Sequence, residues 1–231
     1  MITEPGGLYR LLAWASPAFP IGAFSYSHGL EAAAAEGSVH DRATLESWIK
    51  AVIVRGSGRV DSDILRDAWR AVKVSDDAVL AVTNGRGCAY RATAELATES
   101  GQQGMAFTAA YEAAWTGHHL NPPPLAKESF SGDICHAAAF GAASARAGVS
   151  LGDALTAYLA ACAANLMSAG LRLGIIGQND GQRILAALEL DVSAAVAASL
   201  AREMQDFGSA TFAADLASMA HETQYTRLFR S

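Results

Sequence analysis

The stretch ALTAYLAACAANLMSAGL, residues 154–171, is the most apolar part of the chain and decides between two folds. It is nearly as long as a membrane-spanning helix, so a membrane protein has to be considered. Alanine is only weakly lipophilic, however, and Asp153, Asn165 and Arg172 lie in or beside the stretch. The larger side chains fall on one helical stripe, formed by Leu155, Tyr158, Leu159, Cys162 and Leu166. We therefore predict a buried helix of a helical bundle, with no membrane partner.

The composition around this stretch favours helices throughout. The chain has 231 residues, of which 51% are hydrophobic, and alanine, the best helix former, is abundant. Residues that are β-branched are sparse and scattered, which disfavours a sheet. We predict an all-α, single-domain helical bundle of about eight to ten helices that covers residues 1–231.

The net charge bears on whether the protein binds nucleic acid, and the cysteines bear on the compartment in which it works. The net charge is -6, and no stripe of Lys and Arg marks a surface for nucleic acid. Cys88, Cys135 and Cys162 are odd in number and far apart in the sequence. Such spacing is typical of reduced thiols in a cytosolic protein and not of a disulfide framework.

Prolines divide the chain into two helical blocks. After Pro17 and Pro20, the next prolines form the run 122–124, and no proline follows it. The segment LNPPPLAKESFSGD, residues 120–133, separates the blocks. Neither block resembles a self-sufficient core, so we predict a surface connection around residues 118–132 inside one domain.

Capping residues predict where the helices begin. The expected N-caps are Asp41, Asp61 or Ser62, Ser75, Asp133 and Ser150. A long helix is expected from about residue 89 to 115, and a further one is expected to begin at Ile184. The pairs Asp61–Asp63 and Asp76–Asp77 are interpreted as carboxylates that favour a helix N-terminus. Residues 177–182, GQNDGQ, are interpreted as a tight polar break.

A search for catalytic motifs gives no reaction centre. The run Ser25-Tyr26-Ser27-His28-Gly29 lacks the first glycine and the preceding strand of a nucleophile elbow. The chain contains no Gly-Lys pair, so it has no phosphate-binding loop of the P-loop type. The glycine-rich residues 170–181 lack the strand and the spacing of a dinucleotide loop. We predict that the protein is not an enzyme and needs no cofactor.

Possible metal ligands occur only as scattered pairs. They are His28 with Glu31, His118 with His119, Cys135 with His136, and His221 with Glu222. None has the spacing of an established metal motif, and a site needs three or four converging ligands. A small helical metal-binding protein or metalloenzyme that uses His28, Cys135, His136 or His221 stays open as the alternative.

The unusual chemistry is concentrated near the two ends of the sequence. Residues 16–31, SPAFPIGAFSYSHGLE, combine prolines, glycines and aromatic residues, and residues 221–231, HETQYTRLFRS, have no apolar period. Aromatic residues and Arg dominate the hot spots of protein interfaces. Two prolines and Gly22 can fix a bent loop from which Phe19, Phe24 and Tyr26 project. Either these residues bind a partner or Arg227 and Arg230 only anchor the tail on the body, and both roles can hold; we expect the loop and the tail to lie near each other.

The same segments resemble the urease accessory protein UreF family. The resemblance lies in residues 16–31, in NLMSAGLRLGIIGQNDGQRILAAL at 165–188, in ASMAHETQYTRLFRS at 217–231, and in ELATESGQQGMAF at 95–107. These motifs follow the family's order from about residue 8 to residue 231. Ile175-Ile176 stands where the family pattern has Pro-Leu.

The resemblance implies a cytoplasmic, all-helical scaffold that is not an enzyme. Members of the family bind the accessory protein UreD, also called UreH, and the GTPase UreG. The complex docks on apo-urease and helps to insert nickel, and the family member usually forms a homodimer within it and has been likened to a regulator of the GTPase. The nucleotide site is then expected on the partner chain.

The resemblance and the residue types together give a set of expected partner-binding residues. Arg172, Gln178, Asp180 and Gln182 are the ones expected to face UreG, and the others are expected to face UreD. The full set is Phe19, Pro20, Phe24, Ser25, Tyr26, Ser27, His28, Glu31, Arg172, Gln178, Asp180, Gln182, His221, Glu222, Tyr225, Arg227, Phe229 and Arg230.

Overall fold

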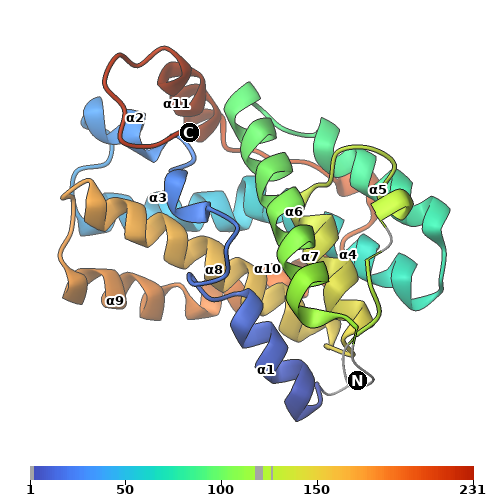
Figure 1. Ribbon diagram of the computed structural model, residues 1–231. Helices are drawn as coiled ribbons and strands as arrows, with labels where there is room; N and C mark the ends of the chain where they lie inside the picture. Colours follow the sequence, from blue (N-terminus) through green and yellow to red (C-terminus); the bar gives the residue numbers. More distant parts are fainter. Residues whose placement is uncertain (1–2, 118–121, 126) are drawn as a thin grey trace.

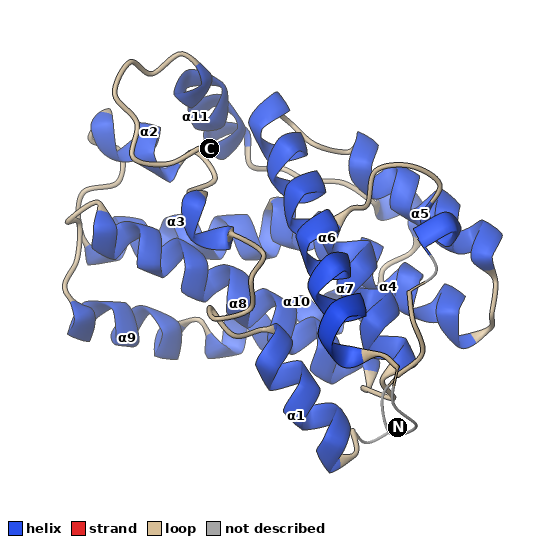
Figure 2. Ribbon diagram, viewed as in Figure 1, coloured by secondary structure: helices blue, strands red, loops and turns tan. Residues whose placement is uncertain are grey.

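The computed structural model describes residues 3–117, 122–125 and 127–231, and these residues form helices and loops without strands (Figures 1 and 2). The predicted all-α class is confirmed. The α-helices of these residues are α1 (Pro5–Trp14), α2 (Leu30–Ala35), α3 (Arg42–Arg55), α4 (Ser57–Lys73), α5 (Asp77–Ala89), α6 (Ala94–Trp115), α7 (His136–Arg146), α8 (Leu151–Arg172), α9 (Gln178–Ala187), α10 (Glu189–Ala201) and α11 (Phe212–Glu222). Short 3₁₀-helices occupy Ala23–Ser25 (η1), Lys127–Phe130 (η2) and Met204–Asp206 (η3). Only Leu188 separates α9 from α10, so the two form a nearly continuous rod.

Helix α7 is the centre of the molecule. Every residue from 137 to 145 in its sequence HAAAFGAASAR is buried. It packs most extensively on α4 and also on α6. At these crossings Gly141 faces the backbone of Leu65, and Gly104 of α6 faces the backbone of Ile134. Small side chains therefore let the helices approach closely, as the alanine-rich sequence predicts.

Helix α8 is the apolar stretch that decided the fold. Two helical stretches are long and apolar enough to cross a membrane, α8 itself and residues 178–201. In the structure α8 packs against α3, α4, α7, α9 and α10, and half of its apolar window is buried. Leu155, Leu159 and Leu166 of its stripe are almost fully buried. This packing is that of a bundle helix, as the sequence predicts.

Two of the expected caps are confirmed. The Asp41 carboxylate accepts the N–H of Thr44 at 2.8 Å, and Thr44 returns the bond in a capping box. The Ser150 hydroxyl accepts the N–H of Asp153 at 3.1 Å and donates to the Asp153 carboxylate. Both pairs satisfy donors that the first helical turn leaves open.

The start predicted for α4 is wrong. Asp61 and Ser62 lie inside this helix, which begins at Ser57 after Gly56. Asp61 and Asp63 are therefore not carboxylates of a helix N-terminus, and both are buried. The chain turns at Gly56 and enters α4 at once, with Gly58 packed against the backbone of α3. The capping pattern does not reveal a turn of this kind.

Three other predicted starts shift for local reasons. Asp76 and not Ser75 caps α5, through the N–H of Val79 at 2.9 Å. The long helix begins at Ala94, with Thr93 as its N-cap, and not near residue 89, which is the last residue of α5. Cys135 and not Asp133 precedes α7.

The polar residues 177–182 are not a break. They open α9, which begins at Gln178 and not at Ile184, with Gly177 as the N-cap residue. The turn lies just before them, where Gly174 has a φ of 73°. The expectation of a polar break is therefore wrong by a few residues.

The predicted connection around residues 118–132 is described in part. Residues 118–121, which include His118 and His119, and residue 126 lie outside the described residues. In the described part, Leu125 donates its N–H to the Glu112 carboxylate at 2.6 Å, and Phe130 is buried. Helices of both blocks share the core around α7. This shared packing supports the single-domain organisation of residues 1–231, which stays a prediction.

Candidate functional site

The loop of residues 15–29 and the tail of residues 223–231 lie side by side. The N–H of Ser27 donates to the Ser231 carbonyl at 2.8 Å, and the N–H of Arg230 donates to the Ser25 carbonyl at 2.8 Å. In Figure 1 the C-terminus accordingly lies beside α2 and α11, at the opposite end of the molecule from α1. The predicted proximity of the two segments is confirmed.

A buried carboxylate holds the tail by its backbone. Glu31, in the first turn of α2, accepts the N–H of Leu228 at 2.6 Å and the N–H of Phe229 at 2.9 Å. Burial alone raises the pKa of Glu31, but the two N–H groups and His221 outweigh it and lower that pKa. The carboxylate is thus kept ionised where the chain needs an acceptor.

His221 joins three helices beneath the tail. Its side chain is fully buried, with Nε2 at 3.1 Å from the Glu31 carboxylate and Nδ1 at 2.7 Å from the Glu95 carboxylate. The other oxygen of Glu95 pairs with Arg227 of the tail at 2.8 Å. Residues from α2, α6 and α11 therefore fix the position of the tail together.

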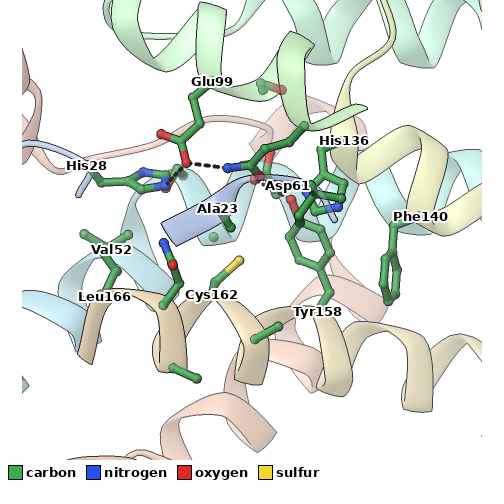
Figure 3. A pocket seen from close by; sticks show the side chains of 18 of the residues that line it. Ala23, His28, Val52, Asp61, Glu99, His136, Phe140, Tyr158, Cys162 and Leu166 are labelled. Atoms are coloured by element: carbon green, nitrogen blue, oxygen red, sulfur yellow. Dashed lines mark hydrogen bonds and ion pairs between the residues drawn. The ribbon is translucent and has the colours of Figure 1, made fainter. Parts of the chain in front are cut away.

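A second buried carboxylate, Glu99 of α6, connects the loop to the end of the tail. It lies 3.0 Å from His28 and accepts the Ser231 hydroxyl at 3.0 Å, and Gln103 donates to it at 2.8 Å. Figure 3 shows His28 and Glu99 pointing toward each other. Burial alone lowers the pKa of His28, but the charge and hydrogen bond of Glu99 outweigh it and raise that pKa.

Arg172, the last residue of α8, contacts both the loop and the tail. Its guanidinium donates to the Phe24 carbonyl and lies 4.3 Å from the centre of the Phe229 ring. A cation over an aromatic ring is attracted by the ring quadrupole. Arg172 therefore binds loop and tail to each other.

The outward aromatic surface is smaller than the sequence predicts. Phe24 is 68% exposed, but Phe19 is only 9% exposed and Tyr26 only 4%, so the expectation that all three project is wrong. Phe19 packs on Phe107 of the core, and the Tyr26 hydroxyl donates to Gln102 at 2.5 Å. A core of small alanines leaves space that these rings fill.

The other expected residues divide into supporting and outward ones. Ser27, Glu31, His221 and Phe229 are buried and hold the arrangement from within. Glu222 accepts the N–H of Ala94 at 3.1 Å and so joins α11 to the start of α6. Phe24, Tyr225, Arg227 and Arg230 face outward, and together with Leu228, which was not among the expected residues, we call them the end surface. Pro20 is also exposed, and Ser25 is half-buried.

The residues expected to face the GTPase do not form one cluster with Arg172. Arg172 contacts the loop and tail, whereas Gln178, Asp180 and Gln182 lie at the beginning of α9. Asp180 pairs there with Arg183 at 2.8 Å. Gln178 and Gln182 share one helical face, and Asp180 lies on another.

Behind the loop lies a cavity of about 390 Å³ (Figure 3). Arg91 lies 2.8 Å from the Asp61 carboxylate and donates to the Cys135 sulfur at 3.1 Å. The Tyr158 hydroxyl donates to the other Asp61 oxygen at 3.0 Å. Burial lowers the pKa of His136 to about 4, so this imidazole is neutral.

The charged groups around the cavity are paired with one another. Asp61 and Glu99 each face a cation, and burial raises the pKa of the Cys162 thiol, which weakens it as a nucleophile. In residues 3–117, 122–125 and 127–231, no three His, Cys, Asp or Glu side chains converge as ligands of one ion. Glu31 and Glu95 approach His221 from its two different nitrogens, so the three cannot share an ion. The geometry is that of a structural hydrogen-bond network.

The sequence interpretation missed the three charged residues that organise the site. Glu95, Glu99 and Arg91 come from α6 and the segment before it, and none was singled out. The signal was present as two glutamates four residues apart, which share one helical face without a basic partner on the same helix. Such a face needs cations from elsewhere in the fold.

Comparison with known proteins gives one consistent family. A family model described as UreF matches residues 39–189. The chain is 45% identical to the urease accessory protein UreF of Granulibacter bethesdensis, over 99% of this chain and 96% of that protein. It is 44% identical to UreF of Rhodopseudomonas palustris strain BisA53, over 99% of this chain and 98% of that protein. The protein whose tail is held in this way therefore belongs to the UreF family of urease accessory proteins.

Proposed function

We propose that this protein is a non-catalytic scaffold for the maturation of urease in the cytoplasm. Its relatives are named urease accessory proteins, which supports the role. In this proposal it binds UreD and the GTPase UreG, forms a homodimer within that complex, and docks on apo-urease. Nickel is the cargo of the complex and not a resident cofactor of this chain.

The observation that carries the proposal is the seating of the tail on the loop. Two backbone hydrogen bonds, the Glu31 carboxylate and the Arg172 side chain hold it in one conformation. A surface that is already ordered loses less conformational entropy on binding. The end surface then presents aromatic, aliphatic and Arg side chains, which are typical of interface hot spots. We assign it to UreD.

A capture experiment with purified UreD tests this assignment. Phe24→Ala, Tyr225→Ala and Arg230→Ala are expected to weaken capture, each by at least about fivefold, since truncation of a hot-spot residue costs 1 kcal/mol or more. Val82→Ala is the matched control, because Val82 is equally exposed but lies on α5. Undiminished capture by all three folded variants would remove the assignment.

The polar start of α9 is the surface that we propose for UreG. Gln178 and Gln182 are four residues apart and share a face there, Asp180 lies in the same helical turn, and Arg172 supports the proposal only indirectly because it is bound to the loop and tail. A triple Ala variant of the α9 residues is expected to reduce UreG recruitment and leave UreD capture unchanged. Loss of UreD capture instead would show that the two surfaces are not separate.

Nickel titration of the isolated protein tests the alternative function. His28, Cys135 and His221 are engaged with Glu99, Arg91 and two carboxylates, respectively. We expect no tight stoichiometric binding. Tight binding that is lost on substitution of these residues or His136 would favour a metal-binding protein.

A further inference from the structure

We propose that His221 is a protonation-dependent latch that decides whether the tail of residues 223–231 is seated. The claim about the tail stands on the geometry alone, and its consequence for partner capture rests on the proposed function. The latch consists of His221 with Glu31 and Glu95, three side chains that come from α11, α2 and α6.

With Glu31 and Glu95 both ionised, the two contacts of His221 require the imidazolium form. A neutral imidazole has one N–H donor and one lone pair, whereas the imidazolium donates from both nitrogens. Here Nε2 lies 3.1 Å from a Glu31 oxygen and Nδ1 lies 2.7 Å from a Glu95 oxygen. Loss of a proton therefore places a lone pair against a carboxylate oxygen at one of these contacts.

The charges around the ring balance only when His221 is protonated. The groups that face it are Glu31 of α2, Glu95 of α6 and Arg227 of the tail, which pairs with Glu95. Of the other charged groups nearby, Glu222 is bonded to the Ala94 N–H and Glu99 is paired with His28. Two carboxylates thus face Arg227 and the imidazolium. Deprotonation leaves one negative charge uncompensated in a buried place, which is costly.

The same carboxylate that contacts His221 also holds the tail. The Glu31 oxygen at His221 Nε2 is the oxygen that accepts the Phe229 N–H, and its other oxygen accepts the Leu228 N–H. In the tautomer whose lone pair is on Nε2, neutral His221 repels the Glu31 side chain from both donors; in the other tautomer it repels Glu95, the partner of Arg227. Because hydrogen bonds to charged groups are the strong ones, the tail then opens. With Glu95 repelled instead, the contact of Arg227 to Glu95 weakens, so either tautomer loosens one attachment of the tail.

The test is hydrogen exchange at the Leu228 and Phe229 amides of the isolated protein. Protection factors are used, since they remove the intrinsic pH dependence of exchange. In the wild type we expect protection to fall as the pH rises and His221 loses its proton, which the imidazole resonances report in parallel. In His221→Gln, which cannot carry the charge, we expect about tenfold lower protection at neutral pH, with little dependence on pH.

Two further variants keep the test sharp. Glu95→Gln removes one of the two negative charges that face the imidazole, so the difference in protection between low and high pH is expected to shrink. His28→Asn separates the contribution of the neighbouring His28–Glu99 pair, and the pH dependence at Leu228 and Phe229 is expected to remain. His40→Gln is the control, because His40 is an exposed histidine whose side chain contacts Gly37 and Asp41 and not the tail. Helix content by circular dichroism shows that each variant folds.

The outcomes separate this proposal from the one on function. Protection that is unchanged in His221→Gln, or that depends on pH as in the wild type, overturns the latch even if UreD is still captured. Should His221→Gln fail to fold, a wild-type protection factor that stays constant while the imidazole titrates overturns it equally. Opened tails with undiminished UreD capture would leave the latch intact and contradict the end surface as the UreD site.

Discussion

At the scale of single residues, the site is held by buried carboxylates that accept from the backbone. Glu31 and Glu99 are nearly inaccessible, yet each has hydrogen bonds to its oxygens and a histidine beside it. A buried charge is tolerated only when it is paired in this way. The hydrogen bonds that Glu31 and Glu99 need for their burial hold the tail, which has no helical or apolar pattern of its own.

The first prediction at this scale concerns Glu31. Glu31→Gln removes the negative charge that accepts the Leu228 and Phe229 N–H groups, and we expect a loss of about 1.5–3 kcal/mol from the free energy of unfolding. The tail should also become sensitive to limited proteolysis. Glu36→Gln is the control, because Glu36 is exposed at the other end of α2. Equal stability and equal proteolysis of the two variants would show that Glu31 does not hold the tail.

A second prediction uses the raised pKa of His28. A pKa raised in the folded protein means that protonated His28 contributes stability that is fully present below about pH 6.5, the value for a free histidine. That contribution is lost as the pH rises through the folded-state pKa. The wild type should therefore lose stability relative to His28→Asn over this range in urea unfolding. Asn tolerates the positive φ of 53° at this position, so the comparison reports the charge and not the backbone.

At the scale of elements, close packing of α2 on α11 sets the seat of the tail. A Cβ on Gly29, just before α2, would lie 2.6 Å from the Ser218 backbone nitrogen and 3.1 Å from the Ala214 carbonyl oxygen. The position also has a φ of 74°. Both facts admit only glycine here. The seat of the tail thus depends on a residue that makes no contact through a side chain.

A matched pair of glycine variants tests this packing. Gly37 has a similar φ of 80° but open space where a Cβ would lie, so Gly37→Ala should cost only about 1–2 kcal/mol for the backbone conformation. Gly29→Ala should cost clearly more, because α2 and α11 must move apart. Thermal unfolding of both variants measures the difference. Similar losses for the two would mean that the contact at Gly29 is not tight.

The element scale also shows what the sequence could predict. Apolar spacing placed α8 and α3 because a long buried stripe leaves few alternatives. It failed at α4, where the two aspartates taken for a helix start are buried partners of Arg91, Arg66 and Arg202. Local capping rules cannot distinguish a carboxylate at a helix end from one whose cation comes from a distant segment. The inward turn of Phe19 and Tyr26 escaped prediction for the same reason, since it depends on the space left by other helices.

At the scale of the whole molecule, the described helices form one support for the paired loop and tail. Helix α7 packs on α4 and α6 at the centre, while residues distant in sequence meet at the end occupied by α2 and α11 (Figure 1). The chain belongs to the UreF family, and urease accessory proteins of similar length match nearly all of it. The central claim is that the seated tail is the part of the protein that its role in urease maturation depends on.

Removal of residues 227–231 tests that claim most directly. The deletion takes away the hydrogen bonds of Leu228, Phe229 and Arg230 but leaves every α-helix, since α11 ends at Glu222. The measurement is urease activation in cells that express the deletion variant, with helix content of the purified protein as the control. The account predicts that activation is lost and helix content stays the same. Full activation by the shortened, folded protein would contradict it.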